Sequence, residues 1–248
     1  MARLTLADGS ELAYAQTPGR GPGVVFLGGF RSDMEGSKAL FLEGLCKTLG
    51  LAFVRFDYLG HGQSSGKFED GTISRWTQDV LTILEQCTQG PQIVVGSSMG
   101  GWLMLLAALA QPQRIKALVG IAVAPDFLEE LVWPEFSEAD KRTLEREGAV
   151  FGEADDPNDP PYHFTKALMD DGRANLLLPQ KHWPLRCPVR LLHGMKDTVV
   201  PWKYSQKIVQ HVYSEDVTLT LIKDGDHRLT RPQDLEKLRA VILELTQT

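Results

Sequence analysis

The segment 96–101, Gly-Ser-Ser-Met-Gly-Gly, carries the clearest chemical signal in the sequence. It fits the pattern G-x-S-x-G with Ser98 at the centre, which places a serine on a sharp turn between a strand and a helix. Side chains two residues before and after Ser98 would collide with such a turn, so glycine is required at both positions. The apolar segments Gln92–Val95 and Trp102–Ala110 supply the predicted strand and helix. We therefore predict Ser98 as a nucleophile in a strained backbone conformation.

A serine nucleophile needs a general base and an acid that orients the base. In this strand–turn–helix setting the chain order is serine, acid, histidine. Asp197 follows the predicted strand Val189–His193, and His227 follows the predicted strand Val217–Ile222. Both lie beyond the carboxyl ends of strands, where open parallel sheets bind ligands. We therefore predict that Asp197 orients His227 and that His227 activates Ser98.

Three other carboxyl groups are alternative candidates for the acid. Asp224 and Asp226 lie too close to His227 along the chain to reach its far ring nitrogen easily. Asp126 follows the predicted strand Ala117–Val123, a rarer position for the acid. The sequence favours Asp197 and leaves these alternatives open.

None of the other five histidines follows the last predicted strand, so none is expected to be the base. His193 lies inside a strand and is interpreted as a core histidine, whereas His61 is interpreted as shaping a turn. His163 and His182 lie in a segment without predicted strands, and His211 closes a predicted helix.

A serine hydrolase also needs two backbone N–H groups aimed at the developing oxyanion. One is expected from Met99, the residue after the nucleophile. The other is expected from the loop after the predicted strand Gly23–Leu27, with Phe30 favoured and Gly29 as the alternative. Glycines in this loop would let the backbone approach a substrate closely, although a simple tight turn would also use them.

Strand-like and helix-like segments alternate along most of the chain, which predicts an α/β fold with a mostly parallel central sheet and helices on both faces. A hairpin around Asp8-Gly9 opens the chain. The further predicted strands are Gly23–Leu27, Leu51–Phe56, Gln92–Val95, Ala117–Val123, Val189–His193 and Val217–Ile222, and the helices are Ser37–Leu49, Trp76–Cys87, Trp102–Ala110, Tyr204–His211 and Leu235–Leu245.

The segment from Pro125 to Pro188 breaks this alternation, because it is acidic, contains several prolines and has no convincing strand. It is too long for an ordinary loop. We interpret residues 125–188 as a helical lid inserted into a single domain that spans residues 1–248. Its candidate helices are Phe127–Val132, Glu138–Glu147 and Phe164–Asp171.

Apolar side chains at the start of this lid could form a wall for an acyl chain, or could simply pack on the core. Those predicted to bind substrate are Phe127, Leu131 and Trp133. Arg31 is a candidate for recognising a carboxylate on the leaving group. Gly29 is also predicted to bind substrate, because it lies in the same loop as Arg31.

Composition excludes several classes of protein. The chain has 248 residues, a formal net charge of −6 and 43% hydrophobic residues, which suits a globular domain and argues against a nucleic-acid binder. No apolar run approaches the roughly 18 residues of a membrane-spanning helix. The N-terminal residues lack the features of a leader, which predicts the cytoplasm, or the mitochondrial matrix if a natural leader is missing.

Cofactor and metal sites are not expected. The three cysteines are Cys46, Cys87 and Cys187; they form no C-x-x-C pair and are interpreted as thiols in a reducing compartment. Motifs for zinc proteases, phosphate-binding loops and dinucleotides are missing from the sequence.

Five motifs together resemble those of α/β-hydrolases, and more narrowly those of the mitochondrial acyl-glucuronide esterases and palmitoyl-protein thioesterases and their bacterial relatives. The resemblance spans nearly the whole chain and is weakest in the lid. Around Asp155–Pro161 this sequence differs from the sequences of that family. It implies Ser98 as nucleophile, Asp197 as acid and His227 as base. The motifs are segments 56–64 (FDYLGHGQS), 96–105 (GSSMGGWLML), 191–197 (LLHGMKD), 200–202 (VPW) and 226–228 (DHR).

The predicted function is hydrolysis of a carboxylic ester or thioester through an acyl-enzyme. The substrate would be a small acyl ester or thioester or an S-acylated protein, and the protein would be a monomer or a small homo-oligomer. The alternatives are a general short-chain carboxylesterase, a hydrolase of carbon–carbon or peptide bonds, and a ligand-binding protein without turnover.

Overall fold

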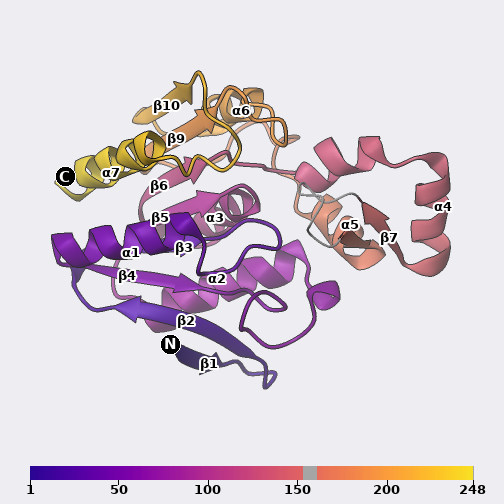
Figure 1. Cartoon of the computed structure of the whole chain (residues 1–248), viewed down its shortest axis with the longest axis horizontal. Helices are drawn as coiled ribbons and strands as arrows, with labels where there is room; N and C mark the ends of the chain where they lie inside the picture. Colours follow the sequence, from indigo (N-terminus) through magenta and orange to yellow (C-terminus); the bar gives the residue numbers. More distant parts are fainter. Residues whose placement is uncertain (153–160, 248) are drawn as a thin grey trace.

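The computed structural model describes residues 1–152 and 161–247 of the chain. Its centre is an eight-stranded sheet in the order β1-β2-β4-β3-β5-β6-β9-β10 (Figure 1). The pairs β1–β2 and β2–β4 are antiparallel and all other neighbours are parallel. The predicted opening hairpin and mostly parallel sheet are therefore confirmed. The strands are β1 Ala2–Thr5, β2 Glu11–Thr17, β3 Arg20–Leu27, β4 Leu51–Phe56, β5 Gln92–Ser97, β6 Ile115–Ile121, β9 Val189–Gly194 and β10 Val217–Ile222.

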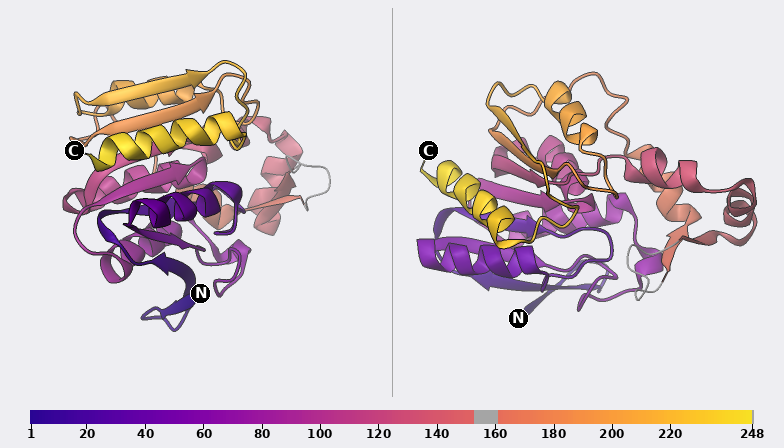
Figure 2. Two further views of the ribbon diagram at one scale, coloured as in Figure 1. Left: turned by 60° about the vertical axis from the view of Figure 1, so that its left-hand side comes forward. Right: turned by 45° about the horizontal axis from the view of Figure 1, so that its top comes forward.

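Helices cover both faces of the sheet, as Figure 2 shows, with α1 and α7 on one face and α2, α3 and α6 on the other. Side chains of a strand alternate between faces, so Val24 and Phe26 pack toward α1 and α7 while Val25 and Leu27 pack toward α2 and α3. The helices are α1 Ser37–Leu49, α2 Ile73–Cys87, α3 Met99–Ala110, α6 Lys203–His211 and α7 Pro232–Thr246.

Local signals explain several helix ends. Helix α1 ends before Gly50, which has a φ of 66° and donates its N–H back to the carbonyl groups of Cys46 and Lys47. Helix α2 begins after Thr72, whose side chain accepts a hydrogen bond from the Arg75 N–H. The end of α1 at Gly50 agrees with the prediction, whereas α2 begins three residues before the predicted start at Trp76.

The segment between β6 and β9 lies beyond the carboxyl ends of the strands, with α4 far from the sheet (Figure 1). The prediction that it holds no strand is wrong. Strands β7 Ala149–Gly152 and β8 Tyr162–Thr165 pair antiparallel, from Ala149 with Thr165 to Gly152 with Tyr162. The remaining elements are the π-helical turn η3 Leu128–Val132, the 3₁₀ turn η4 Trp133–Glu135, and helices α4 Glu138–Glu147 and α5 Lys166–Ala174.

The predicted helices of this segment are partly confirmed. Helix α4 has the predicted bounds and starts with a capping box between Ser137 and Asp140. Phe164, predicted to start a helix, instead lies in β8 because its segment pairs with β7. The sequence departure around Asp155–Pro161 falls almost wholly on residues 153–160, which lie outside the described residues.

Candidate active site

Ser98 sits on the turn that joins β5 to α3. Its φ of 54° and ψ of −120° are unfavourable for a residue with a side chain, as the sequence predicted. A Cβ atom on Gly96 would overlap the backbone of Gly100, and one on Gly100 would overlap the carbonyl group of Leu27. The two glycines are therefore needed for close packing of α3 against β5 and β3.

The ends of neighbouring strands hold this turn. The Ser98 N–H donates to the Ile121 carbonyl at 2.9 Å, and its carbonyl accepts from Gly101 at 2.9 Å and Ala124 at 3.2 Å. The side chain is partly exposed, and its hydroxyl has no hydrogen-bond partner within the part of the chain that the structure describes. The hydroxyl is thus available to a substrate.

Asp197 and His227 meet at the same edge of the sheet. Nδ1 of His227 lies 2.7 Å from Oδ2 of Asp197, whose side chain is fully buried. Oδ1 of Asp197 accepts the N–H groups of Val199 and Val200 at 2.9 and 2.8 Å. Burial raises the pKa of Asp197, but hydrogen bonds from two histidines and Val200 outweigh burial and hold the pKa well below its usual range. Asp197 is therefore a carboxylate that can orient His227.

The alternative acids make other contacts. Asp224 pairs with Arg231 at 2.7 Å, and Asp226 accepts the Leu229 N–H at 2.9 Å. Asp126 is buried and accepts the N–H groups of Leu177 and Leu178 at 2.7–3.0 Å, which joins the inserted segment to the end of β6. Among these four carboxylates only Asp197 contacts His227 in the described hydrogen bonds.

His193 has a contact that the sequence analysis missed. It is fully buried, as predicted for a core histidine, but Nε2 lies 3.2 Å from Oδ2 of Asp197. The sequence held a signal for this contact, namely the four-residue spacing between His193 and Asp197. A tight turn directly after a strand brings residues at this spacing close together. Asp197 therefore faces two imidazole rings.

The backbone N–H groups of Met99, Phe30 and Gly29, all near Ser98, have no acceptor within the described residues. The Phe30 loop is close to Ser98, because a Cβ atom on Gly29 would lie 3.4 Å from Cβ of Ser98. The N–H of Arg31 is already used, since it donates to Nε2 of His61 at 3.3 Å. Phe30, the favoured donor, and Gly29, the alternative, therefore both keep a free N–H in this loop.

His61 does more than shape a turn. Its Nδ1 lies 3.2 Å from the Leu59 carbonyl, which can only accept, so Nδ1 carries the proton and Nε2 accepts from Arg31. Burial lowers the pKa of His61 to about 4, with a smaller contribution from the Arg31 charge. His61 is therefore neutral at neutral pH and holds the loop in place.

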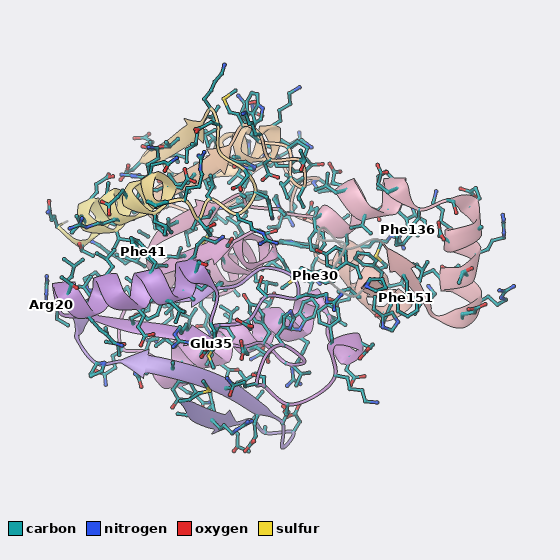
Figure 3. All side chains as sticks on the ribbon, viewed as in Figure 1. Arg20, Phe30, Glu35, Phe41, Phe136 and Phe151 are labelled. Atoms are coloured by element: carbon teal, nitrogen blue, oxygen red, sulfur yellow. The ribbon has the colours of Figure 1, made fainter. Side chains whose placement is uncertain are left out.

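The side chain of Phe30 lies between the sheet and the inserted segment, as Figure 3 shows. Its ring contacts Phe68 and Trp76 of the main body, with ring centroids 4.9 and 6.0 Å apart. On the other side it contacts three rings of the inserted segment at 5.5–5.7 Å: Phe127, Tyr162 and Phe164.

The other residues predicted to bind substrate are spread over the insertion. Phe127 contacts Phe30, and Leu131 packs against Ala124, Val200 and Tyr204. Trp133 lies further out, between the cations of Arg173 and Lys141 and against Phe136. The contacts of Trp133 are thus made within the inserted segment.

Arg31 joins the loop to the insertion. Its guanidinium donates to the Pro161 carbonyl at 2.8 Å and lies over the rings of Phe68 and Tyr162. The remaining histidines make contacts elsewhere: His163 with Glu69, His182 with Tyr213, and His211 with the carbonyl groups of Lys207 and Leu178.

Strained backbone gathers at this edge of the sheet. In the described ranges, every non-glycine residue with a positive φ follows the carboxyl end of a strand; these residues are Arg31, Ser98, Ala122, Asp126 and Leu229. Such conformations cost about 1–3 kcal/mol each and typically cluster at functional sites. The clustering identifies this edge as the candidate active site.

Two further observations concern residues 1–152 and 161–247. Their His, Cys, Asp and Glu side chains form no group of three or more that could hold a metal ion. None of their helices is both long enough and apolar enough to span a bilayer.

Comparisons with known proteins agree with this geometry. Residues 24–239 match the model of the alpha/beta hydrolase family. The chain is 40% identical over 242 residues to the palmitoyl-protein thioesterase ABHD10, mitochondrial, of Bos taurus, and 40% identical over 245 residues to the Homo sapiens protein of that name. Each alignment covers 98% of this chain and 78% of the relative.

Two solved structures are similar over nearly their whole length. The alpha/beta hydrolase domain-containing protein 10 from mouse has a TM-score of 0.91 and 38% identity, covering 99% of this chain and 98% of its own. A protein from Agrobacterium vitis S4 has a TM-score of 0.93 and 39% identity, covering 98% and 97%.

Proposed function

The chain belongs to the alpha/beta hydrolase family and is a hydrolase of the esterase and thioesterase type, and from this premise we propose that Ser98, His227 and Asp197 are its catalytic triad. The observation that carries the proposal is the 2.7 Å contact between the buried Asp197 and His227, at the sheet edge that also holds the strained Ser98. Nucleophilic attack by serine requires a base of this kind.

The proposed reaction has two steps. His227 takes the proton of the Ser98 hydroxyl through Nε2, and the serine oxygen attacks the carbonyl carbon of the substrate. His227 then protonates the leaving group, which leaves an acyl group on Ser98. In the second step His227 activates water, which releases the acid. Asp197 holds the imidazole in the tautomer with the proton on Nδ1 and stabilises its charged form.

The oxyanion formed in each step would accept hydrogen bonds from the N–H groups of Met99 and Phe30. Both lack an acceptor among the described residues, and each such donor typically contributes about 10²–10³-fold to kcat. The N-terminus of α3 adds a favourable dipole at the same place.

We propose a long-chain acyl thioester, such as an S-acylated cysteine of a protein, as the substrate. The relatives named palmitoyl-protein thioesterase support this, and so do the apolar side chains of Phe127 and Leu131 beside the loop and the Asp197 turn. A thiol leaves more readily than an alcohol because its pKa is lower. The three free cysteines and the mitochondrial relatives favour a reducing compartment, the cytoplasm or the mitochondrial matrix.

An acyl glucuronide is a second candidate substrate. Its leaving group carries a carboxylate, which a guanidinium can bind. Arg31 supplies such a group and is the residue that follows Phe30, the proposed oxyanion donor, in the chain. Binding would require Arg31 to hold the carboxylate alongside its contact with the Pro161 carbonyl.

A hydrolysis panel tests the proposal. It compares p-nitrophenyl esters of increasing chain length, an S-palmitoylated peptide and an acyl glucuronide, on the wild-type protein, on Ser98→Ala and on the neighbouring Ser97→Ala as a matched control. We expect Ser98→Ala to lower kcat at least about 10³-fold and Ser97→Ala to change it little. Full activity of Ser98→Ala would exclude the triad, and turnover of short esters alone would make the protein a general carboxylesterase.

A further inference from the structure

His193 lies in a fully buried polar chain behind the proposed triad. Its Nδ1 lies 2.7 Å from Oγ of Ser205 on α6, and its Nε2 lies 2.9 Å from the Val200 carbonyl and 3.2 Å from Oδ2 of Asp197. The side chains of His193 and Asp197 are 0% exposed, and Ser205 is 0% exposed as well. No solvent competes with these hydrogen bonds.

The contacts determine the tautomer of His193. A carbonyl and a carboxylate can only accept, so Nε2 must carry a proton and divide it between Val200 and Asp197. In the neutral ring, Nδ1 carries no proton and accepts a hydrogen bond from the Ser205 hydroxyl. Ser205 thus holds His193 in the form that donates to Asp197.

Oδ2 of Asp197 consequently receives two imidazole N–H groups, from His227 at 2.7 Å and from His193 at 3.2 Å. A second donor stabilises the negative charge of a carboxylate and reduces how strongly it attracts a neighbouring proton or cation. His193 therefore influences His227 without touching it.

We propose that His193 is a positioning residue, which holds Asp197 in its rotamer and limits the strength with which Asp197 stabilises the charged form of His227. The inference rests on the proposed triad. It assigns to the His193–Ser205 pair the task of holding Asp197 in place and moderating how its charge acts on His227.

The pH profile of kcat/KM is the appropriate measurement, because its acid limb reports the ionisation of the base in the free enzyme. Among the described residues, Asp226 and Arg228 flank His227 in its own loop, and Lys38 of α1 reaches this loop, because its Nζ donates to the Arg228 carbonyl at 2.6 Å. These groups are unchanged in the variants described next, so a shift of the limb reports on His193.

The experiment compares His193→Leu with His193→Gln. Leucine removes the donor, so we expect the acid limb to move to higher pH by about 0.5–1 unit and kcat to fall about 10-fold. Glutamine places an amide N–H near the position of Nε2, so we expect its limb within about 0.2 unit of wild type. A limb that stays at the wild-type pH in His193→Leu would overturn the inference, as would an equal shift in both variants.

A measurement on the unaltered protein covers the case in which His193→Leu does not fold. Nitrogen NMR with labelled histidine should find the neutral ring of His193 with its proton on Nε2. A proton on Nδ1 would contradict the inference, because Nε2 could then not donate to Asp197. Ser205→Ala should weaken this preference and shift the acid limb in the same direction as His193→Leu, by a smaller amount.

The two proposals fail in distinguishable ways. If Ser98→Ala and His227→Ala keep full activity, the triad is wrong and the limb does not belong to His227. If both lose activity while the limb of His193→Leu coincides with that of wild type, the triad stands and only the role of His193 is wrong.

Discussion

Ser98 joins its chemistry to a backbone conformation that costs stability. Its φ of 54° and ψ of −120° match the first central residue of a type II′ turn, where glycine is favoured because it has no Cβ atom. The Ser98 N–H donates to the Ile121 carbonyl and the Ala124 N–H donates to the Ser98 carbonyl, and these two hydrogen bonds hold the turn in place despite this cost. The proposed nucleophile therefore occupies a backbone conformation that favours glycine.

We predict that Ser98→Gly is more stable than Ser98→Ala by about 1–2 kcal/mol, because glycine relieves the strain that alanine keeps. Neither variant has the proposed nucleophile, so we expect both to be inactive. The two variants are therefore compared by their free energies of unfolding alone. Urea unfolding of the two variants at one pH measures the difference. A glycine variant less stable than the alanine variant would show that the turn is not strained.

An aromatic contact set centred on Phe30 is one of the links between the inserted segment and the site. Phe30 presents its ring to Phe164 of β8, with the planes 6° apart and the centroids 5.7 Å apart, while its N–H is the proposed oxyanion donor. Packing at β8 and the position of this N–H are thus linked through one residue. Figure 3 shows Phe30 at this junction and Phe151 on the outer part of the insertion.

We predict that Phe164→Leu lowers kcat about 3–10-fold, because the Phe30 ring loses its stacked partner and the N–H is held less well. The matched control is Phe151→Leu on the neighbouring strand β7, whose side chain is 66% exposed and stacks on His163. Steady-state kinetics with one activated ester measures both. Equal kcat values for the two variants would contradict the link between β8 and the loop.

At the scale of the whole molecule, two buried groups oppose each other in acid. Burial raises the pKa of Asp79 to about 6, and burial lowers the pKa of His61 to about 4. Both contact Leu59, whose N–H donates to Asp79 at 2.9 Å and whose carbonyl accepts from His61 at 3.2 Å. They therefore act on the same part of the fold.

The signs of the two effects differ. Between about pH 4 and pH 6 the folded protein holds a proton on Asp79 that the unfolded chain lacks. The contribution of Asp79 to the free energy of unfolding therefore falls as pH rises. Between about pH 4 and pH 6.5 the unfolded chain holds a proton on His61 that the folded protein lacks, so stability rises with pH. In wild type the two contributions largely cancel.

Removing one group should expose the other. We predict that the unfolding free energy of Asp79→Asn rises by about 1–3 kcal/mol more than that of wild type between pH 4.5 and pH 6.5, and that His61→Gln shows the opposite difference. Urea unfolding at three pH values in this range measures both slopes. Parallel slopes in all three proteins would mean that neither group titrates in this way.

The sequence by itself determined the features that depend on near neighbours. The glycines around Ser98 predict the strained turn, and the chain order of Ser98, Asp197 and His227 follows from which strand each one ends. The bounds of α1 and α4 also follow from local periodicity and capping residues. The turn and the helix bounds can be predicted because each is specified by residues close together in the chain.

Only the tertiary structure decided which groups meet across long separations. It brought Asp197, which the sequence already favoured, into contact with His227, and it placed the Arg31 N–H against His61. It also paired β7 with β8, since two short strands are stabilised by each other and not by their own sequence. Contacts of this kind depend on how the sheet brings distant loops to one edge, and no local pattern encodes that.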